Sequence, residues 1–125
     1  MSELADHWNR LAWEDFKTAK AMRKAGHYPH CGYFCRQTAE KALKALVAQY
    51  CDELQFPPKT HDLVRLAKLS GMATEDTFFE PEYWEFLKLL NPLQIETRNR
   101  PMTRAFCRDL LTRTEEFLHW STQML

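Results

Sequence analysis

The sequence predicts an all-α protein, an antiparallel up-and-down bundle of three long and two short helices. Apolar residues recur at spacings of three and four over long stretches, which is the period of one helix face. Only three glycines occur in 125 residues, too few for the glycine-dependent turns of an all-β fold. A chain of this length buries about two-thirds of its unfolded surface, so residues 1–125 are expected to form one domain.

Three long helices follow from the apolar pattern. The first is expected over residues 3–25, with Ser2 as its N-cap and Gly26 as its stop. The second is expected over residues 29–50, because a proline at position 29 suits a first helical turn. The third is expected over residues 102–124. The apolar positions of the first are Leu4, Trp8, Leu11, Ala12, Phe16, Ala19 and Met22.

Two short helices are expected between the second and third long ones. Residues 56–60 contain two consecutive prolines, which remove backbone donors and force extended geometry, so a loop is expected there. Thr60 is expected to cap a short helix that ends near Ser70, where Gly71 closes it. A second short helix is expected over residues 81–90, opened by a proline.

The composition also bears on the environment of the protein. The 17 Lys and Arg residues balance the 17 Asp and Glu residues, which argues against a general nucleic-acid coat but leaves local patches open. No apolar stretch approaches the roughly 18 to 20 residues of a membrane span, and the N-terminus is polar. We therefore expect a cytoplasmic protein without a membrane partner, whose four cysteines are free thiols.

An arginine-rich stretch follows an acidic one. Residues 72–96 hold six acids and one base, whereas residues 98–113 hold five arginines and one acid. Arg100, Arg104 and Arg108 are four apart and form one stripe if they lie on a helix. Guanidinium groups bind phosphate oxygens bidentately, so this stretch is a candidate phosphate site. The alternative is that the arginines pair with the acidic segment or with water.

Four metal-capable side chains lie within nine residues at the start of the second long helix. Zinc accepts two imidazoles together with two thiolates. The same stretch contains Tyr33 and Phe34, and buried free cysteines pack as small hydrophobes. Ordinary packing is therefore the favoured interpretation, with no metal or other cofactor expected. The metal-capable residues are His27, His30, Cys31 and Cys35.

His61 and Asp62 form a second candidate constellation. A carboxylate beside a histidine orients the ring and supports acid–base chemistry. Adjacent residues on a helix point about 100° apart, however, so each is expected to serve the helix start separately. Asp62 then meets the positive end of the helix dipole.

The residue spacing resembles the HEPN domain family of helical bundle proteins. The most specific piece is the run Gln-x-Ala-Glu-Lys-Ala-Leu-Lys-Ala at residues 37–45. Downstream, His-Asp-Leu at residues 61–63 is similar to a helix start of the family, and Thr97-Arg98 stands where many members have Thr-Arg-Tyr-Pro. The resemblance covers essentially the whole chain. Further matching positions are Trp8, Ala12, Asp15, Ala19, Gly26, His27, Tyr28, Phe34 and Leu66.

The resemblance implies a four-helix-type bundle that forms homodimers, often beside a small nucleotidyltransferase in toxin–antitoxin-like pairs. Members that cut RNA carry an arginine, a polar residue and a histidine at the start of the last long helix. Arg98 and Asn99 supply the first two, but residues 103–105 are Thr, Arg and Ala, so the expected histidine is missing. The sequence therefore favours a non-catalytic module that binds a nucleotide, RNA or a nucleotidyltransferase. Its candidate ligand-binding residues are Arg98, Asn99, Arg100 and Arg104.

A metal-independent ribonuclease with a degenerate motif is the alternative function. In that case Arg98 stabilises phosphate charge, and His61 or His119 replaces the missing histidine. Arg113 and His119 have the nominal spacing of the motif, but they lie late in the last helix. A purely structural subunit, whose arginines form salt bridges, is the third possibility.

Two further features bear on binding and assembly. Lys41 and Lys44 add positive charge near Arg98 if the second and last long helices pack together, although Lys44 also lies four residues after Glu40 in the favourable order for a local ion pair. Trp13 only borders the apolar face of the first helix. Because an exposed apolar strip is a common signature of a dimer contact, a homodimer through the long helices is expected.

Overall fold

The protein was analysed as a computed structural model, which describes residues 2–51, 59–71, 79–94 and 102–125. These residues form five helices and no strand. The all-α prediction, with three long and two short helices, is therefore confirmed. None of the described helices is long and apolar enough to cross a membrane. The helices are α1 (Glu3–Lys24), α2 (Tyr28–Tyr50), α3 (Leu63–Leu69), α4 (Pro81–Leu90) and α5 (Arg104–Gln123).

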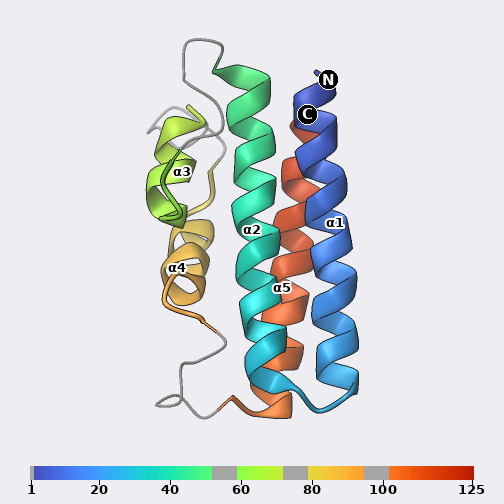
Figure 1. Ribbon diagram of the computed structural model, residues 1–125. Coiled ribbons are helices and arrows are strands. Elements are labelled where there is room, and N and C mark those ends of the chain that lie inside the picture. The colour runs from blue at the N-terminus through green and yellow to red at the C-terminus, as the bar shows by residue number, and fades with distance from the viewer. Residues whose placement is uncertain (1, 52–58, 72–78, 95–101) are drawn as a thin grey trace.

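The three long helices lie side by side, with α1 antiparallel to both α2 and α5 (Figure 1). Near the chain ends, the Tyr50 hydroxyl donates to the main-chain oxygen of Met124, which joins the end of α2 to the end of α5. At the opposite end, the Cys107 thiol lies 3.6 Å from the main-chain oxygen of Tyr28. Consequently α2 and α5 both begin where α1 ends.

Side-chain caps and glycine stops set the helix ends. Ser2 Oγ accepts from the Ala5 N–H at 3.0 Å and Thr103 Oγ1 accepts from the Phe106 N–H at 3.0 Å, each a standard N-cap contact. Gly26 follows α1 with φ +84°, a backbone conformation that glycine adopts without steric penalty. The predictions for Ser2 and Gly26 are confirmed.

The predicted cap of α3 was wrong. Asp62, rather than Thr60, is the N-cap, and its carboxylate accepts from the Val64 N–H at 3.0 Å. Thr60 Oγ1 instead accepts from the Asp62 N–H at 3.1 Å, one step before the helix begins. The prediction that Asp62 serves the start of α3 is confirmed.

The helix α2 lies at the centre of the molecule, between α1 on one side and the α3–α4 pair on the other (Figure 1). Of its 23 residues, 13 are buried, and these include the charged side chains of Arg36, Glu40 and Lys44. Gly32 on α2 allows a close approach, because a Cβ there would lie 2.6 Å from Met102 Cε. Because neighbouring helices cover α2 on several sides, its polar residues are buried as well as its apolar ones.

Aromatic side chains hold α4 against α5. The ring centroid of Phe117 on α5 lies 5.3 Å from Tyr83, 5.6 Å from Phe86 and 5.6 Å from Trp120. On the other side of the bundle, the Trp13 indole N–H donates to Thr122 Oγ1 at 3.1 Å. Trp13 thus links α1 to α5 within the chain.

Candidate functional site

Basic side chains gather at the end of the bundle where α1 ends and α2 and α5 begin. The Arg23 Nε donates to the main-chain oxygen of Arg104 at 3.1 Å, which joins the last turn of α1 to the first turn of α5. Arg104 and Arg108 are exposed and lie one helical turn apart. We call this surface the basic end, and it consists of Arg23, Lys24, His27, His30, Arg104 and Arg108.

The backbone adds to the positive potential of the basic end. Neither α2 nor α5 has an acidic residue in its first turn, so no carboxylate there offsets the positive end of either helix dipole, although Thr103 caps the Phe106 N–H of α5. Among the described residues, only Asp109 pairs with a member of the basic end, at 3.6 Å from Arg108. Both side chains are well exposed, and such a pair contributes at most about 1 kcal/mol. The basic end can therefore attract an anion.

The structure divides the predicted ligand-binding residues. Arg104 lies in the basic end, whereas Arg98, Asn99 and Arg100 fall outside the described residues. Because α5 begins at Arg104, the described part of the predicted arginine stripe consists of Arg104 and Arg108.

Lys41 and Lys44 lie away from the basic end, although α2 and α5 do pack together. The Lys41 ammonium pairs with the Asp15 carboxylate on α1. Lys44 is only 6% exposed, and its ammonium lies 3.2 Å from Glu40 Oε2 and 5.1 Å from the centroid of the Trp8 ring. Lys41 is 13 residues beyond the start of α2, or about 20 Å along the helix. Burial and distance therefore separate both lysines from Arg104.

A buried cluster of charged residues runs along α2, from Arg36, which faces α3 and α4, to Lys44, which lies against Trp8 of α1. The Arg36 Nη1 donates to Glu40 Oε1 at 3.0 Å, its Nε donates to the main-chain oxygen of Asn91 at 3.0 Å, and its Nη2 donates to that of His61 at 2.7 Å. One guanidinium thus connects α2 to the start of α3 and the end of α4. We call Arg36, Glu40 and Lys44 the α2 charge cluster. The sequence analysis missed Arg36 and Asn91, although Arg36, Glu40 and Lys44 are each four residues apart with alternating charge.

His61 and Asp62 have separate partners. The His61 Nδ1 lies 3.4 Å from Glu40 Oε2, and the His61 side chain is 74% exposed. The Asn91 Nδ2 donates to Asp62 Oδ1 at 2.9 Å, and this bond, with the backbone N–H groups at the start of α3, holds the pKa of Asp62 below its usual value. His119, the other candidate histidine, lies 3.6 Å from Glu115 on the exposed face of α5.

Comparison with known proteins assigns the family. The model of the HEPN domain matches residues 5–125. The chain belongs to the HEPN domain family. Its structure is similar to the crystal structure of an archaeal HEPN homologue, with a TM-score of 0.74, 98% of each chain covered and 16% sequence identity, which shows the fold alone. A search of the curated proteins found no match. The resemblance that rested mainly on residues 37–45 is thereby confirmed.

Three of the four cysteines of this HEPN domain lie in its core, and Cys51 is only partly buried. Cys31, Cys35 and Cys107 are fully buried, while His27 is exposed at the basic end. A hydrogen bond with Cys35, together with burial, raises the pKa of Cys31, and burial raises that of Cys107 to about 12. A protonated thiol is a poor metal ligand. In the parts of the chain that the structure describes, no three His, Cys, Asp or Glu residues are arranged to hold a metal ion.

The α2 charge cluster makes the stability of the HEPN domain sensitive to acid. Burial alone raises the pKa of Glu40, but the Lys44 charge and hydrogen bonds from Arg36, Lys44 and His61 outweigh it and hold the pKa below its ordinary value of 4.5. Stability from this group is complete above about pH 4.5 and is lost as the pH falls through the lower folded-state pKa. Below pH 4.5, the free energy of unfolding of the wild type is therefore expected to fall more steeply than that of Glu40→Gln. Urea titrations at several pH values measure both slopes, and equal slopes would contradict this assignment.

Proposed function

We propose that this HEPN domain is a non-catalytic subunit that binds a phosphate-bearing ligand, a nucleotide or an RNA end, at its basic end. The observation that supports this most is the convergence of Arg23, Lys24, Arg104 and Arg108 on two helix N-termini without acidic residues. Guanidinium groups donate bidentately to phosphate oxygens, and the backbone N–H groups of a helix N-terminus that no cap occupies donate to the same kind of ligand. Arg98, Asn99 and Arg100 precede α5 in the sequence and are proposed to extend this site.

Binding is favoured over cleavage by the surroundings of the histidines in the basic end. The rings of His27 and His30 contact each other edge to face, with centroids 5.7 Å apart. Among the described residues, no carboxylate forms an ion pair with either of them. General acid–base catalysis by histidine commonly uses such an orienting carboxylate.

Assembly and partner are part of the same proposal. We propose that the domain acts in the cytoplasm as a homodimer, beside a nucleotidyltransferase in a toxin–antitoxin-like pair, as the resemblance implies. The balanced charge of 17 basic and 17 acidic residues does not oppose association of two copies.

Replacing Arg104 and Arg108 together by alanine is expected to weaken RNA binding by at least about tenfold, because two guanidinium contacts to phosphate are lost. The measurement is fluorescence anisotropy with a 5′-phosphorylated, 3′-labelled RNA at several salt concentrations. The slope of log affinity against log salt is expected to decrease by about 0.7 for each lost phosphate contact.

The matched control for this test is Arg10→Ala with Lys17→Ala. Both residues are exposed on α1 and pair with Asp6 and Glu14, so the control removes the same charge from another surface. Equal weakening by the two double variants would contradict a specific site. A third variant, Arg98→Ala with Arg100→Ala, is expected to weaken binding too, and unchanged affinity would remove these two residues from the site.

The ribonuclease alternative has one observation in its favour. His61 lies against the buried carboxylate of Glu40 and exposes most of its ring, as a general base requires. Incubating the same RNA with the wild type and with Arg98→Ala, His61→Ala and His119→Ala tests it. We expect no turnover by any of them at catalytic protein concentration. Cleavage by the wild type that is lost in Arg98→Ala would replace the binding function by a ribonuclease.

A further inference from the structure

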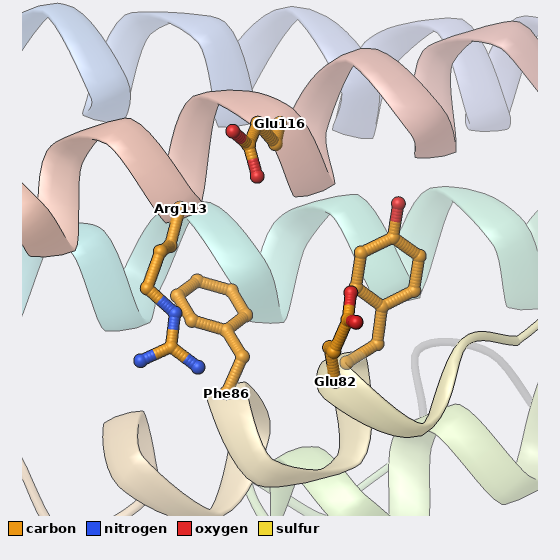
Figure 2. A pocket seen from close by; sticks show the side chains of 5 residues that line it. Glu82, Phe86, Arg113 and Glu116 are labelled. Carbon is orange, nitrogen blue, oxygen red and sulfur yellow. The ribbon is translucent and has the colours of Figure 1, made fainter.

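A shallow pocket of about 240 Å³ lies between α4 and α5. Its α4 side is formed by Glu82, Tyr83 and Phe86, and its α5 side by Arg113 and Glu116 (Figure 2). In Figure 2 the Arg113 guanidinium lies beside Phe86, and Glu82 lies at the other end of the pocket. Arg113 is nine residues beyond Arg104, or about 14 Å along α5, so the pocket is separate from the basic end.

The two carboxylates of the pocket differ from their neighbours on the same helices. Glu85 on α4 lies 3.6 Å from Lys88, and Glu115 on α5 lies 3.6 Å from His119. Glu82 and Glu116 form no ion pair with any described residue, although Arg113 lines the same pocket. Their negative charge is therefore available to a ligand.

The floor of the pocket is aromatic and already accommodates a cation. The Arg113 guanidinium lies 5.5 Å from the centroid of the Phe86 ring, within the range of a cation–π contact. Half-buried Tyr83 forms the other part of the floor and packs against Trp120, with centroids 5.2 Å apart. Burial raises the pKa of Tyr83, and the charges of Glu80, Glu116 and Glu82 raise it further. The field at the Tyr83 hydroxyl is therefore negative, which favours a cationic group.

We propose that this pocket binds the cationic side chain of an arginine or lysine from a partner polypeptide. The cation lies at the Tyr83 end, between Glu82 and Glu116, while Arg113 keeps its place over Phe86. Charge complementarity selects this occupant, because carboxylates and an electron-rich ring face attract a cation and repel phosphate. A shallow pocket covers only the tip of a side chain, so the surrounding surface of α4 and α5 meets the rest of the partner.

The test uses the whole chain and a tripeptide with a central arginine, blocked at both ends, titrated while the NMR signals of the Tyr83 ring are followed. The same peptide with citrulline has nearly the same shape without the charge. We expect the arginine peptide to shift the Tyr83 signals to saturation, and citrulline to bind at least about tenfold more weakly. Glu82→Gln with Glu116→Gln is expected to lower the affinity for the arginine peptide by at least about tenfold as well.

The matched control is Glu85→Gln with Glu115→Gln, which removes the same charge from the same two helices outside the pocket. It is expected to keep the wild-type affinity within about twofold, since exposed charges act weakly at a distance. Four results would each overturn the proposal. The two double variants could lose the same affinity for the arginine peptide, or the citrulline peptide could bind as tightly as the arginine peptide. The arginine peptide could also leave the Tyr83 signals unshifted, or RNA could shift them in its place. Arg104→Ala with Arg108→Ala is expected to leave peptide binding unchanged. A failure of the proposed peptide site can therefore be distinguished from a failure of the proposed phosphate site.

Discussion

Glu40→Ala is expected to lower the free energy of unfolding by about 3–5 kcal/mol, because it removes one member of a buried ion cluster. The Glu40 side chain is only 7% exposed and accepts from both Arg36 and Lys44. Its loss leaves two cations inside the bundle without their carboxylate. The carboxylate contact that orients His61 is lost as well.

Urea denaturation followed by circular dichroism measures this loss. The control is Glu85→Ala on α4, where the carboxylate pairs with Lys88 at the surface and removal is expected to change stability by at most about 1 kcal/mol. Glu40→Gln keeps the shape of the side chain and part of its hydrogen bonding, so it is expected to lie between wild type and Glu40→Ala. A loss for Glu40→Ala no larger than that of the surface control would show that the cluster contributes little to stability.

Phe117→Ala is expected to lower the free energy of unfolding by about 3–5 kcal/mol through the cavity it leaves. Phe117 is fully buried, and its ring contacts Phe79, Tyr83, Phe86 and Trp120. Three of these four contacts join α5 to residues 79–90, so the variant is expected to weaken mainly the packing of α4 on α5. Hydrogen exchange is therefore expected to rise more in α4 than in α1.

The control for Phe117 is His119→Ala, an exposed position two residues further along α5, which is expected to stay within about 0.5 kcal/mol of wild type. Phe117→Leu fills most of the cavity and is expected to lose less than Phe117→Ala. If the alanine variant unfolded at the same urea concentration as the wild type, the aromatic cluster would not be what holds α4 in place.

Local chemistry in the sequence predicts the helices well. Proline at position 81 marks the start of α4, and glycines at positions 26 and 71 follow the ends of α1 and α3. The structure places these helix ends where the sequence predicted them. The start of α3 was missed by two residues, because Thr60 and Asp62 are both good N-caps and the choice depends on a bond from Asn91, 29 residues away. Spacing along one helix carries no information about such a distant partner.

The same limit explains the α2 charge cluster. The pairing of Glu40 with Lys44 is visible in the sequence, and the structure confirms it at 3.2 Å. The sequence does not show that this pair is buried, because residues distant in the sequence cover it: α3 and α4 lie on one side of α2, and Trp8 of α1 lies over Lys44. The contacts of Arg36 to His61 and Asn91 span 25 and 55 residues. The candidate phosphate site depends on packing in a similar way. The sequence predicts the arginines near the start of α5, but Arg23 lies beside them only because α1 packs against α5.

Both chain ends lie at the end of the bundle opposite the basic end. The ends of α2 and α5 meet beside the start of α1, and the basic end lies at the other pole of the 23-residue helix α2, about 35 Å away (Figure 1). The basic end therefore stays accessible when a fluorophore, an affinity tag or a linker to a surface is attached at either terminus. Two copies immobilised in this way present their basic ends side by side to the solution, which suits measurements on long RNA.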